Sequence, residues 1–472
     1  MSDQENNREV VDPFKPYKGR FKSYHSIPKK GRGKDEIFNE LSTMAREENA
    51  MWESGQVSGT FYHAGEAHRE YLNKVFALFS HVNTLQFDLC PSMFKMESEV
   101  ISMTAKMLHA DAVKQVNPAD EVCGTMTSGG SESIIMAMKT YRDWAREEKG
   151  IHEPEIIMPH TAHPAFDKAG TYFGIKMIHI PVTEPDYRVD PEAVAARINA
   201  NTIALVGSAG NYPYGLIDPL DKLSGLALEH GLGFHVDGCL GGFILPWFEK
   251  LGRDLPLFDF RLPGVTSMSA DTHKYGFALK GTSVVLYRNN NLRRYQYFNT
   301  PDWSGGMYAS PTAAGSRSGG LTAATWASML YLGEEGYLRE AKAIKDVADA
   351  MIAGVKGISE LSLIGDPTFV ISFGSDKVDI YHVNDFMKTR GWRFNPLQLP
   401  PGMHFCVTMP QTFVPGVAER FTDDLREGVA YAKSKAGTPA ETAAIYGIAG
   451  SLEGNQAVTE MVYGVFDHLY SV

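Results

Sequence analysis

Cysteine is scarce in this sequence of 472 residues. The four cysteines are Cys90, Cys123, Cys239 and Cys406, and none of them are spaced as the C-x-x-C pairs of zinc sites and redox motifs. We therefore expect neither a bound metal nor a disulfide framework. Four free thiols are typical of a protein in a reducing cytoplasm, and we predict that location.

Long apolar runs and an excess of basic charge are also missing. No stretch of about 18 consecutive apolar residues occurs, which predicts that there is no transmembrane segment. The first ten residues are polar and lack the apolar core of a secretory signal. Lys and Arg number 45 against 56 Asp and Glu, a net charge of −11. Non-specific nucleic-acid binding needs a basic face, so we expect no nucleic-acid partner.

What the sequence does contain is an alternation of β-rich runs and helical stretches. Apolar runs predict strands over 156–158, 177–182, 203–208, 233–237, 265–269 and 283–287. Helical patterns over 131–148, 190–200 and 219–230 lie between several of them. This alternation predicts an α/β fold with a mainly parallel, buried sheet. In such sheets ligands collect at the carboxyl ends of the strands.

The composition and the predicted secondary structure change towards both ends of the chain. Residues 15–34 hold eight Lys or Arg and no Asp or Glu, with two prolines, which predicts an arm without regular structure. A helix is expected over 34–52. Beyond residue 332, helical and strand patterns predict a smaller α+β unit. We therefore expect an N-terminal arm and helix (1–57), a large domain (58–331) and a C-terminal small domain (332–472).

A glycine-rich turn before the helix at 131–148 is suited to binding a phosphate group. In the segment Thr127-Ser-Gly-Gly-Ser-Glu-Ser133, the glycines let backbone N–H groups approach a ligand closely. The helix N-terminus adds unpaired N–H donors and a positive dipole end. Gly130 and Ser131 are the candidate phosphate-binding residues. A Gly-Gly turn with a serine cap also occurs for structural reasons alone.

Two charged residues follow predicted strands. Asp237 ends the run at 233–237, and a buried carboxylate needs a positive partner, such as a pyridinium nitrogen or an arginine. Lys274 follows the run at 265–269, where a desolvated lysine can form a Schiff base, although a lone lysine is often a surface residue. A phosphate cup, Asp237 and Lys274, in this order, are what pyridoxal 5'-phosphate requires. His163 lies between the cup and Asp237 and is placed to stack on the cofactor ring.

The motifs in combination resemble the sphingosine-1-phosphate lyase family, within the wider group of pyridoxal-dependent decarboxylases. The resemblance covers residues 34–472 and rests on the segments 58–62, 236–243, 269–276, 303–311, 314–320 and 444–449. It implies a fold type I enzyme with a mainly parallel, seven-stranded sheet. It also implies the retro-aldol cleavage of sphingosine-1-phosphate, a phosphorylated long-chain base, to a long-chain aldehyde and phosphoethanolamine.

The resemblance also implies which residues bind the cofactor. By matching motif positions, these are the Schiff-base lysine, the ring-nitrogen partner, the stacking histidine, the phosphate ligands and a serine from a second subunit: Lys274, Asp237, His163, Gly130, Ser131, His273 and Ser316. Because the residue matching Ser316 reaches the cofactor phosphate from the other subunit, the resemblance implies a homodimer with shared active sites.

Substrate-binding positions carry over in the same way. Tyr62 and Lys280 match positions that serve substrate phosphate binding and catalysis, Asn83 is retained, and Tyr212 is a further candidate. The proton of the substrate C3 hydroxyl could pass to Lys280, to the displaced Schiff-base lysine or to the substrate phosphate. The sequence leaves this choice open.

One position departs from the family. Gln86 stands where the family has a histidine linked to the substrate phosphate. Glutamine donates a hydrogen bond but carries no charge, so we expect a changed substrate affinity or head-group preference. Three alternatives to the lyase remain: an amino-acid decarboxylase of the same fold, a lyase for another phosphorylated amino alcohol, and a non-catalytic binding protein.

Overall fold

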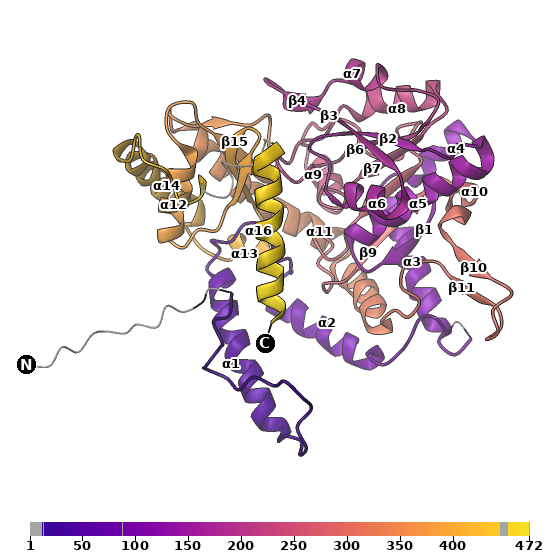
Figure 1. The fold of residues 1–472 in the computed structure, drawn as a ribbon, viewed down its shortest axis with the longest axis horizontal. Helices are drawn as coiled ribbons and strands as arrows, with labels where there is room; N and C mark the ends of the chain where they lie inside the picture. Colours follow the sequence, from indigo (N-terminus) through magenta and orange to yellow (C-terminus); the bar gives the residue numbers. More distant parts are fainter. Residues whose placement is uncertain (1–11, 13, 87, 444–451, 472) are drawn as a thin grey trace, which may run out of the picture.

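The computed structural model describes residues 12, 14–86, 88–443 and 452–471. Figure 1 shows two lobes, a larger one around a seven-stranded sheet and a smaller one around a four-stranded sheet. The motif at 444–449 lies outside the described residues. None of the helices in the described ranges combines the length and apolar character that a membrane crossing needs.

The seven-stranded sheet has the order β1-β9-β8-β7-β6-β2-β3. Its strands are β1 (Cys123–Thr127), β2 (Glu155–Pro159), β3 (Lys176–Ile180), β6 (Thr202–Ser208), β7 (Gly233–Asp237), β8 (Ser267–Ala270) and β9 (Ser283–Tyr287). Only β9 runs antiparallel to its two neighbours, β1 and β8. The predicted mainly parallel sheet is therefore present, and its carboxyl edge gathers the ends of six strands.

Both faces of this sheet are buried, because helices cover each of them. On one face, α5 (Gly130–Lys149) and α6 (Ala165–Phe173) contribute Ile134, Tyr141 and Phe166 to an apolar cluster. On the other, α8 (Leu220–Glu229) and α9 (Leu245–Lys250) contribute Leu223 and Phe248. Central strands such as β6 and β7 are buried along their whole length, which explains their continuous apolar runs.

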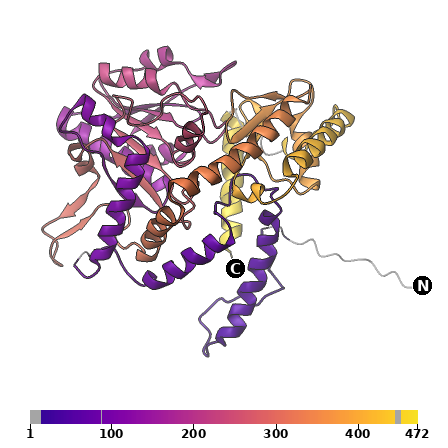
Figure 2. The ribbon, with the colours of Figure 1, turned by 180° about the vertical axis from the view of Figure 1, so that it is seen from behind.

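The smaller lobe is an antiparallel sheet covered by helices. Its strands are β12 (Ser362–Leu363), β13 (Val370–Gly374), β14 (Asn395–Gln398) and β15 (Pro401–Cys406), in the order β12-β13-β15-β14. Its helices are α12 (Ile380–Thr389), α13 (Met409–Thr412) and α14 (Val417–Ser434). The long helix α11 (Gly319–Lys356) runs between the two lobes (Figure 2) and is interrupted at Gly333, whose φ is 56°.

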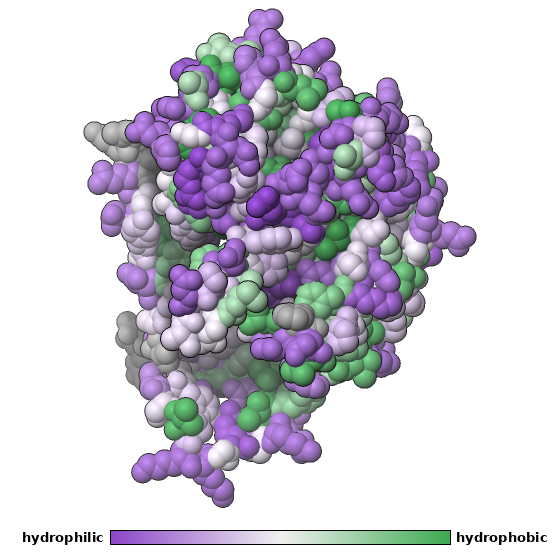
Figure 3. All heavy atoms as spheres, turned by 90° about the vertical axis from the view of Figure 1, so that its right-hand side faces the viewer, coloured by the Kyte–Doolittle hydropathy of each residue, from purple (hydrophilic) through white to green (hydrophobic). Residues whose placement is uncertain are grey.

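Helices near the chain ends lie on the outside of the lobes. They are α1 (Lys34–Glu53), α2 (Glu66–Phe79), α3 (Pro91–Met107), α4 (Val113–Val116) and, at the C-terminus, α16 (Leu452–Tyr470). Helix α1 projects from the body of the molecule (Figure 1). The arm before it meets the last helix, since Lys15 donates from Nζ to the Ser471 carbonyl at 2.6 Å. Hydrophilic side chains cover most of the face in Figure 3, with smaller hydrophobic groups between them.

The remaining elements are short. They are the strand pair β4 (Val182–Thr183) and β5 (Arg188–Val189), the helices α7 (Pro191–Ala195) and α10 (Asn290–Arg293), the hairpin β10 (Phe298–Thr300) and β11 (Tyr308–Ser310), and the 3₁₀ turns Ala110–Ala112 and Arg294–Gln296.

Three sequence predictions of these elements were wrong in detail. The run at 177–182 is divided between β3 and β4, because the chain leaves the large sheet after Ile180. The helix expected over 190–200 ends at Ala195. The helical pattern expected beyond residue 332 belongs to helix α11, which already begins at Gly319, although it opens with two glycines. Those glycines pack where a Cβ would meet Val82 and Phe76, so packing decides the residue type there.

Candidate active site

A cavity of about 350 Å³ lies at the carboxyl edge of the large sheet. Its lining comes from the β1–α5 turn, the loop after β2, and the segments after β7 and β8: Ser128, Gly129, Gly130, Ser131, Glu132, Ile134, His163, Cys239, Asp271, His273 and Lys274. Five of the residues predicted from the sequence therefore line one cavity. Its position agrees with the general rule for ligands in parallel sheets.

The glycine-rich turn forms one wall of this cavity. Gly129 has a φ of 152°, and a Cβ on Gly130 would lie 2.7 Å from the Asp271 carboxylate. Glu132 holds the turn, since its carboxylate accepts from the Ser128 N–H at 2.6 Å and from the Ala313 N–H at 2.9 Å. The first N–H groups of α5 have no carbonyl partner within the helix, so this wall offers donors to an anion.

Lys274 and Asp271 form an ion pair in the cavity. The Lys274 Nζ lies 3.0 Å from Asp271 Oδ2. Burial lowers the pKa of Lys274, but the Asp271 carboxylate outweighs burial and raises the pKa above its usual value. The other oxygen, Asp271 Oδ1, is buried without a hydrogen-bond partner among the described residues. A buried carboxylate oxygen without a donor indicates a place for a polar ligand.

Asp237 lies at the end of β7, beside the cavity and not among its lining residues. Its Oδ1 accepts from the Cys239 N–H at 2.9 Å and from the Ser269 hydroxyl at 3.1 Å. Burial raises the pKa of Asp237, but the Cys239 hydrogen bonds and the nearby His163 and His235 lower it further, so the net shift is downward. The carboxylate is therefore ionised and ready for a cation.

The two predicted histidines both line the cavity. His163 is exposed in the cavity, and its Nδ1 accepts from the Ala165 N–H at 3.1 Å, which fixes the ring at the start of α6. The Nδ1 of His273 accepts from the Thr282 N–H at 3.2 Å. Burial is the main cause that lowers the pKa of His273, with Lys280 and Lys274 acting in the same direction. This histidine is neutral and can donate a hydrogen bond from Nε2.

Tyr62 and Lys280 lie together near the cavity. The Lys280 Nζ sits 4.7 Å from the centroid of the Tyr62 ring. Burial and the neighbouring Lys274 lower the pKa of Lys280 to about 8. The Tyr62 hydroxyl lies 3.9 Å from Cys406 Sγ in the smaller lobe, and its ring contacts Tyr275 edge to face. Both lobes therefore contribute residues to the surroundings of Tyr62.

Tyr212 lies on a neighbouring loop and packs its ring against His404, with the centroids 4.9 Å apart. Its side chain is half exposed. Tyr212 is near enough to raise the pKa of Tyr62 slightly, behind burial and Cys406 as causes. Tyr212 is therefore close to Tyr62 and does not line the Lys274 cavity.

The other three predicted residues do not line this cavity. Asn83 donates from Nδ2 to the Ser316 hydroxyl at 2.9 Å, and Ser316 is exposed. Gln86 is exposed on the loop between α2 and α3. The neighbouring Arg317 anchors the loop that carries Ser316, since its Nη1 and Nη2 donate to the Glu97 carboxylate at 3.2 and 3.1 Å. Within one chain, the structure places Asn83 and Ser316 together but not with Lys274.

Sequence reasoning missed several residues of the site. Asp271, Cys239 and Glu132 line the cavity, and Cys406 contacts Tyr62. Asp271 stands three residues before Lys274, a spacing that allows an ion pair and was the available signal. Glu132 stands four residues after Ser128 and caps its turn. No local pattern indicated Cys406, which comes from the other lobe.

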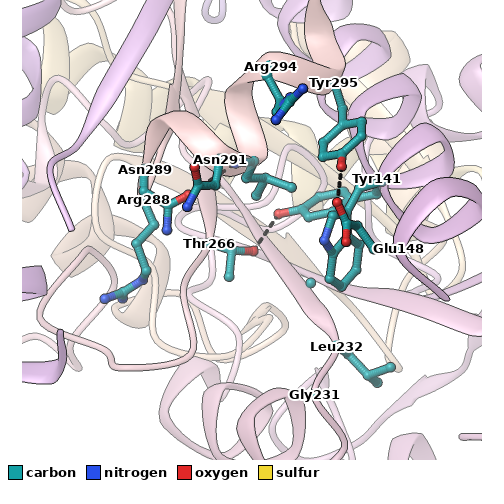
Figure 4. Close-up of a pocket in the computed structure, with 13 residues that line it drawn as sticks. Tyr141, Glu148, Gly231, Leu232, Thr266, Arg288, Asn289, Asn291, Arg294 and Tyr295 are labelled. Atoms are coloured by element: carbon teal, nitrogen blue, oxygen red, sulfur yellow. Dashed lines mark hydrogen bonds between the residues drawn. The ribbon is translucent and has the colours of Figure 1, made fainter. Parts of the chain in front are cut away.

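A second cavity, of about 450 Å³, lies at the opposite edge of the same sheet. Figure 4 shows its lining, which includes Tyr141 from α5, Thr266 before β8 and Arg288 after β9. The Tyr141 hydroxyl lies 2.8 Å from the Thr266 hydroxyl, and the Tyr295 hydroxyl donates to the Glu148 carboxylate. None of the predicted site residues line it, so size does not identify the active site here.

The Lys274 cavity fits pyridoxal 5'-phosphate. It has an amine on Lys274, N–H donors at the start of α5, an ionised carboxylate on Asp237 and a ring face on His163. Its volume is within the usual range for small-ligand sites. The donor-free Asp271 oxygen is consistent with a polar occupant.

Comparisons with known proteins agree with this geometry. Residues 20–373 match the family described as the pyridoxal-dependent decarboxylase conserved domain. The chain is 44% identical to the sphingosine-1-phosphate lyase of Arabidopsis thaliana over 449 residues, covering 94% of this chain and 81% of the relative. It is 43% identical to that of Dictyostelium discoideum over 450 residues, covering 95% and 82%.

Solved structures point to the same family. The structure of the Burkholderia pseudomallei sphingosine-1-phosphate lyase matches with a TM-score of 0.90 and 50% identity, covering 96% of this chain and 99% of that one. A Lactobacillus brevis glutamate decarboxylase, at 21% identity and a TM-score of 0.72 over 90% of this chain and 99% of its own, shows a shared fold alone. The fold is therefore fold type I, and pyridoxal 5'-phosphate is the cofactor. The chain belongs to the pyridoxal-dependent decarboxylase family and, within it, to the sphingosine-1-phosphate lyases.

Proposed function

We propose that the protein cleaves sphingosine-1-phosphate, or a closely related phosphorylated long-chain base, to a long-chain aldehyde and phosphoethanolamine. The observation that carries this is the Lys274 cavity, with its anion-binding turn and ionised Asp237, in a chain 50% identical to a solved sphingosine-1-phosphate lyase. The decarboxylase alternative has weaker support, because a solved glutamate decarboxylase and a solved tryptophan decarboxylase are 21% and 16% identical and share the fold only.

The cofactor-binding roles follow from position. We propose that Lys274 would hold the cofactor covalently through its amine, and that the turn at Gly130 and Ser131, with His273, would bind its phosphate. Asp237 holds the ring nitrogen protonated, and His163 stacks on the ring. Pyridoxal phosphate, when bound, supplies an electron sink for the bond that breaks. The ion pair with Asp271 orients the Lys274 amine into the cavity.

Lys280 is the proposed base for the C3 hydroxyl of the substrate. A pKa of about 8 gives this lysine a substantial neutral fraction near physiological pH, which a proton acceptor needs. Its side-chain nitrogen lies 4.7 Å from the centroid of the Tyr62 ring. Asn83, Gln86 and Tyr212 are proposed to contact the substrate near its phosphate group.

We propose that the active form is a homodimer with shared sites. Asn83 and Ser316 bind each other from two loops and do not line the Lys274 cavity, so we propose that a second copy of the chain brings them to a cavity. Large apolar side chains are exposed on α1 and the β10–β11 connection, namely Phe38, Leu41, Met51, Trp303 and Met307. Apolar surface of this kind is typical of an interface.

We also propose a cytoplasmic location and the division of the chain at about residues 57 and 331. All four cysteines are free, which supports a reducing compartment. The interruption of α11 at Gly333 supports the second boundary.

The function is tested by incubating the purified holoenzyme with sphingosine-1-phosphate and measuring aldehyde, phosphoethanolamine and carbon dioxide together. Equal amounts of aldehyde and phosphoethanolamine, without carbon dioxide, are expected. Aldehyde release from a shorter phosphorylated amino alcohol, but not from the long-chain base, would favour the alternative substrate. Carbon dioxide release from an aromatic amino acid or glutamate would favour a decarboxylase.

A further inference from the structure

A row of buried polar side chains runs along the sheet from Asp237 towards the second cavity. Strands β7 and β8 pair in parallel, with His235 opposite Ser267 and Asp237 opposite Ser269. Residues two apart on a strand share a face, so these four side chains lie on the same face of the sheet. The two serines and His235 are 0% exposed. Burying polar side chains in the centre of a sheet is unfavourable unless they are hydrogen-bonded.

The distances connect them into one chain of hydrogen bonds. The Ser269 hydroxyl donates to Asp237 Oδ1 at 3.1 Å, and His235 Nε2 lies 3.3 Å from the Ser269 oxygen. On the other side of the ring, His235 Nδ1 lies 2.7 Å from the Ser267 oxygen. The Tyr141 hydroxyl, from α5, lies 2.5 Å from that same oxygen. Tyr141 also lines the second cavity (Figure 4).

Only one direction of donation along this row gives every polar atom a hydrogen-bond partner. Asp237 can only accept, so Ser269 donates to it and its oxygen accepts from His235 Nε2–H. His235 then carries its proton on Nε2, and its Nδ1 accepts from the Ser267 hydroxyl. Ser267 in turn accepts from the Tyr141 hydroxyl. Burial lowers the pKa of His235 to about 4, so the ring is neutral, as this pattern requires. All donors point towards the carboxylate, and such aligned bonds reinforce one another.

We propose that His235 is a positioning residue, which with Ser267, Ser269 and Tyr141 holds the Asp237 carboxylate ionised and aimed at the cofactor ring nitrogen. The inference rests on the proposed role of Asp237. The Asp237 Oδ1 receives one donor from the backbone of Cys239 and one from Ser269. Of these two donors only Ser269 acts through its side chain, and its hydroxyl is held by His235 together with the Cys239 thiol, which donates to the Ser269 oxygen at 3.1 Å.

The test measures binding of pyridoxal phosphate to cofactor-free protein, by absorbance titration without substrate. Ser269→Ala and His235→Phe remove a donor from the row, and we expect the cofactor Kd to rise about tenfold or more, with a changed visible absorption band. His235→Gln keeps an N–H donor at the same reach, and we expect it to restore Kd to within about threefold of wild type.

Tyr141→Phe and Tyr287→Phe form a matched control pair. Both tyrosines are fully buried, Tyr141 on α5 and Tyr287 on β9, but Tyr287 bonds to Thr140 and stands outside the row. We expect a small rise in Kd for Tyr141→Phe and none for Tyr287→Phe. Wild-type cofactor affinity and absorption in Ser269→Ala would overturn the proposal, even if His235→Phe failed to fold. An equal loss in Tyr287→Phe would overturn it too, because it would show a general packing effect.

Asp237→Asn separates this inference from the function on which it rests. If Asp237→Asn leaves the cofactor absorption band and Kd unchanged, the role of Asp237 is wrong. If Asp237→Asn weakens binding and Ser269→Ala does not, only the positioning row is wrong.

Discussion

The Lys274 cavity and the second cavity of the larger lobe lie at opposite edges of one sheet and differ in chemistry more than in size. At the carboxyl edge, Lys274 faces a carboxylate with a donor-free oxygen, and the N-terminus of α5 opens into the space. At the amino edge, Tyr141 is bonded to Thr266, and Glu148 to Tyr295. Arg288 in the second cavity also has a buried nitrogen without a partner among the described residues, so the functional edge is identified by a lysine amine beside an anion-binding turn, and not by cavity volume.

The largest effect is expected when Lys274 is replaced. Lys274→Arg keeps a cation beside Asp271 but removes the amine, so aldehyde release should fall by roughly 10³ or more while the thermal midpoint stays near wild type. Lys274→Ala should be equally inactive and less stable, because it leaves the Asp271 carboxylate without its cation. As a control, Asn291→Ala in the second cavity should retain activity. Comparable activity loss in Asn291→Ala would remove the distinction between the cavities.

Replacement of Lys280 should change the pH profile. If neutral Lys280 is the base, kcat/KM rises as pH increases through about 8, because the amine loses its proton there. Lys280→Arg stays charged, so this rise should vanish and kcat should fall by about 10²-fold or more. A fall in wild-type kcat/KM through the same pH range would instead show that the cationic form of Lys280 is required.

Mixing two inactive variants tests whether the site is shared. Ser316→Asp places a negative charge against the cofactor phosphate, and we expect about a 10-fold to 100-fold loss of activity. Ser316→Asp and Lys274→Arg chains, unfolded and refolded together, should regain about a quarter of wild-type activity, because half of the random dimers carry one intact site. If Ser316 serves the cavity of its own chain, no mixed dimer has an intact site and activity cannot recover. Mixed dimers without recovered activity would therefore contradict the shared site.

The smallest effect is expected at Gln86. This residue is exposed, so Gln86→His should leave the fold unchanged and add a partial positive charge near the proposed substrate phosphate. We expect KM for sphingosine-1-phosphate to fall about threefold to tenfold, with kcat almost constant. Gln86→Asn is the matched control for side-chain length. An unchanged KM in both variants would place the substrate phosphate elsewhere.

Local patterns predicted the parts of the site that a short segment can specify. The turn at Gly130, the end of β7 at Asp237 and the segment after β8 at Lys274 each combine a strand end with a characteristic residue, and a parallel sheet brings such ends to one edge. The strands themselves were readable because full burial makes their sequences continuously apolar. Strand β1 was missed, since Cys123-Gly-Thr-Met-Thr127 is not apolar enough to stand out.

Long-range contacts were beyond the reach of local patterns. The approach of Cys406 to Tyr62 joins the two lobes, and the Asn83–Ser316 bond joins residues 233 positions apart. Which of these contacts form depends on how whole elements pack, and no spacing in the sequence encodes it. The pKa of Lys280 belongs to the same class, because burial and Lys274 set it in the folded chain only.

The most direct test of the account is to locate the cofactor on the chain. Borohydride reduction of the holoenzyme fixes pyridoxal phosphate on the lysine that holds it, and peptide mass spectrometry then identifies that residue. The account predicts one label per chain, on the peptide that contains Lys274, with none in Lys274→Arg. A label on Lys280, or an unchanged label in Lys274→Arg, would contradict the assignment of the active site.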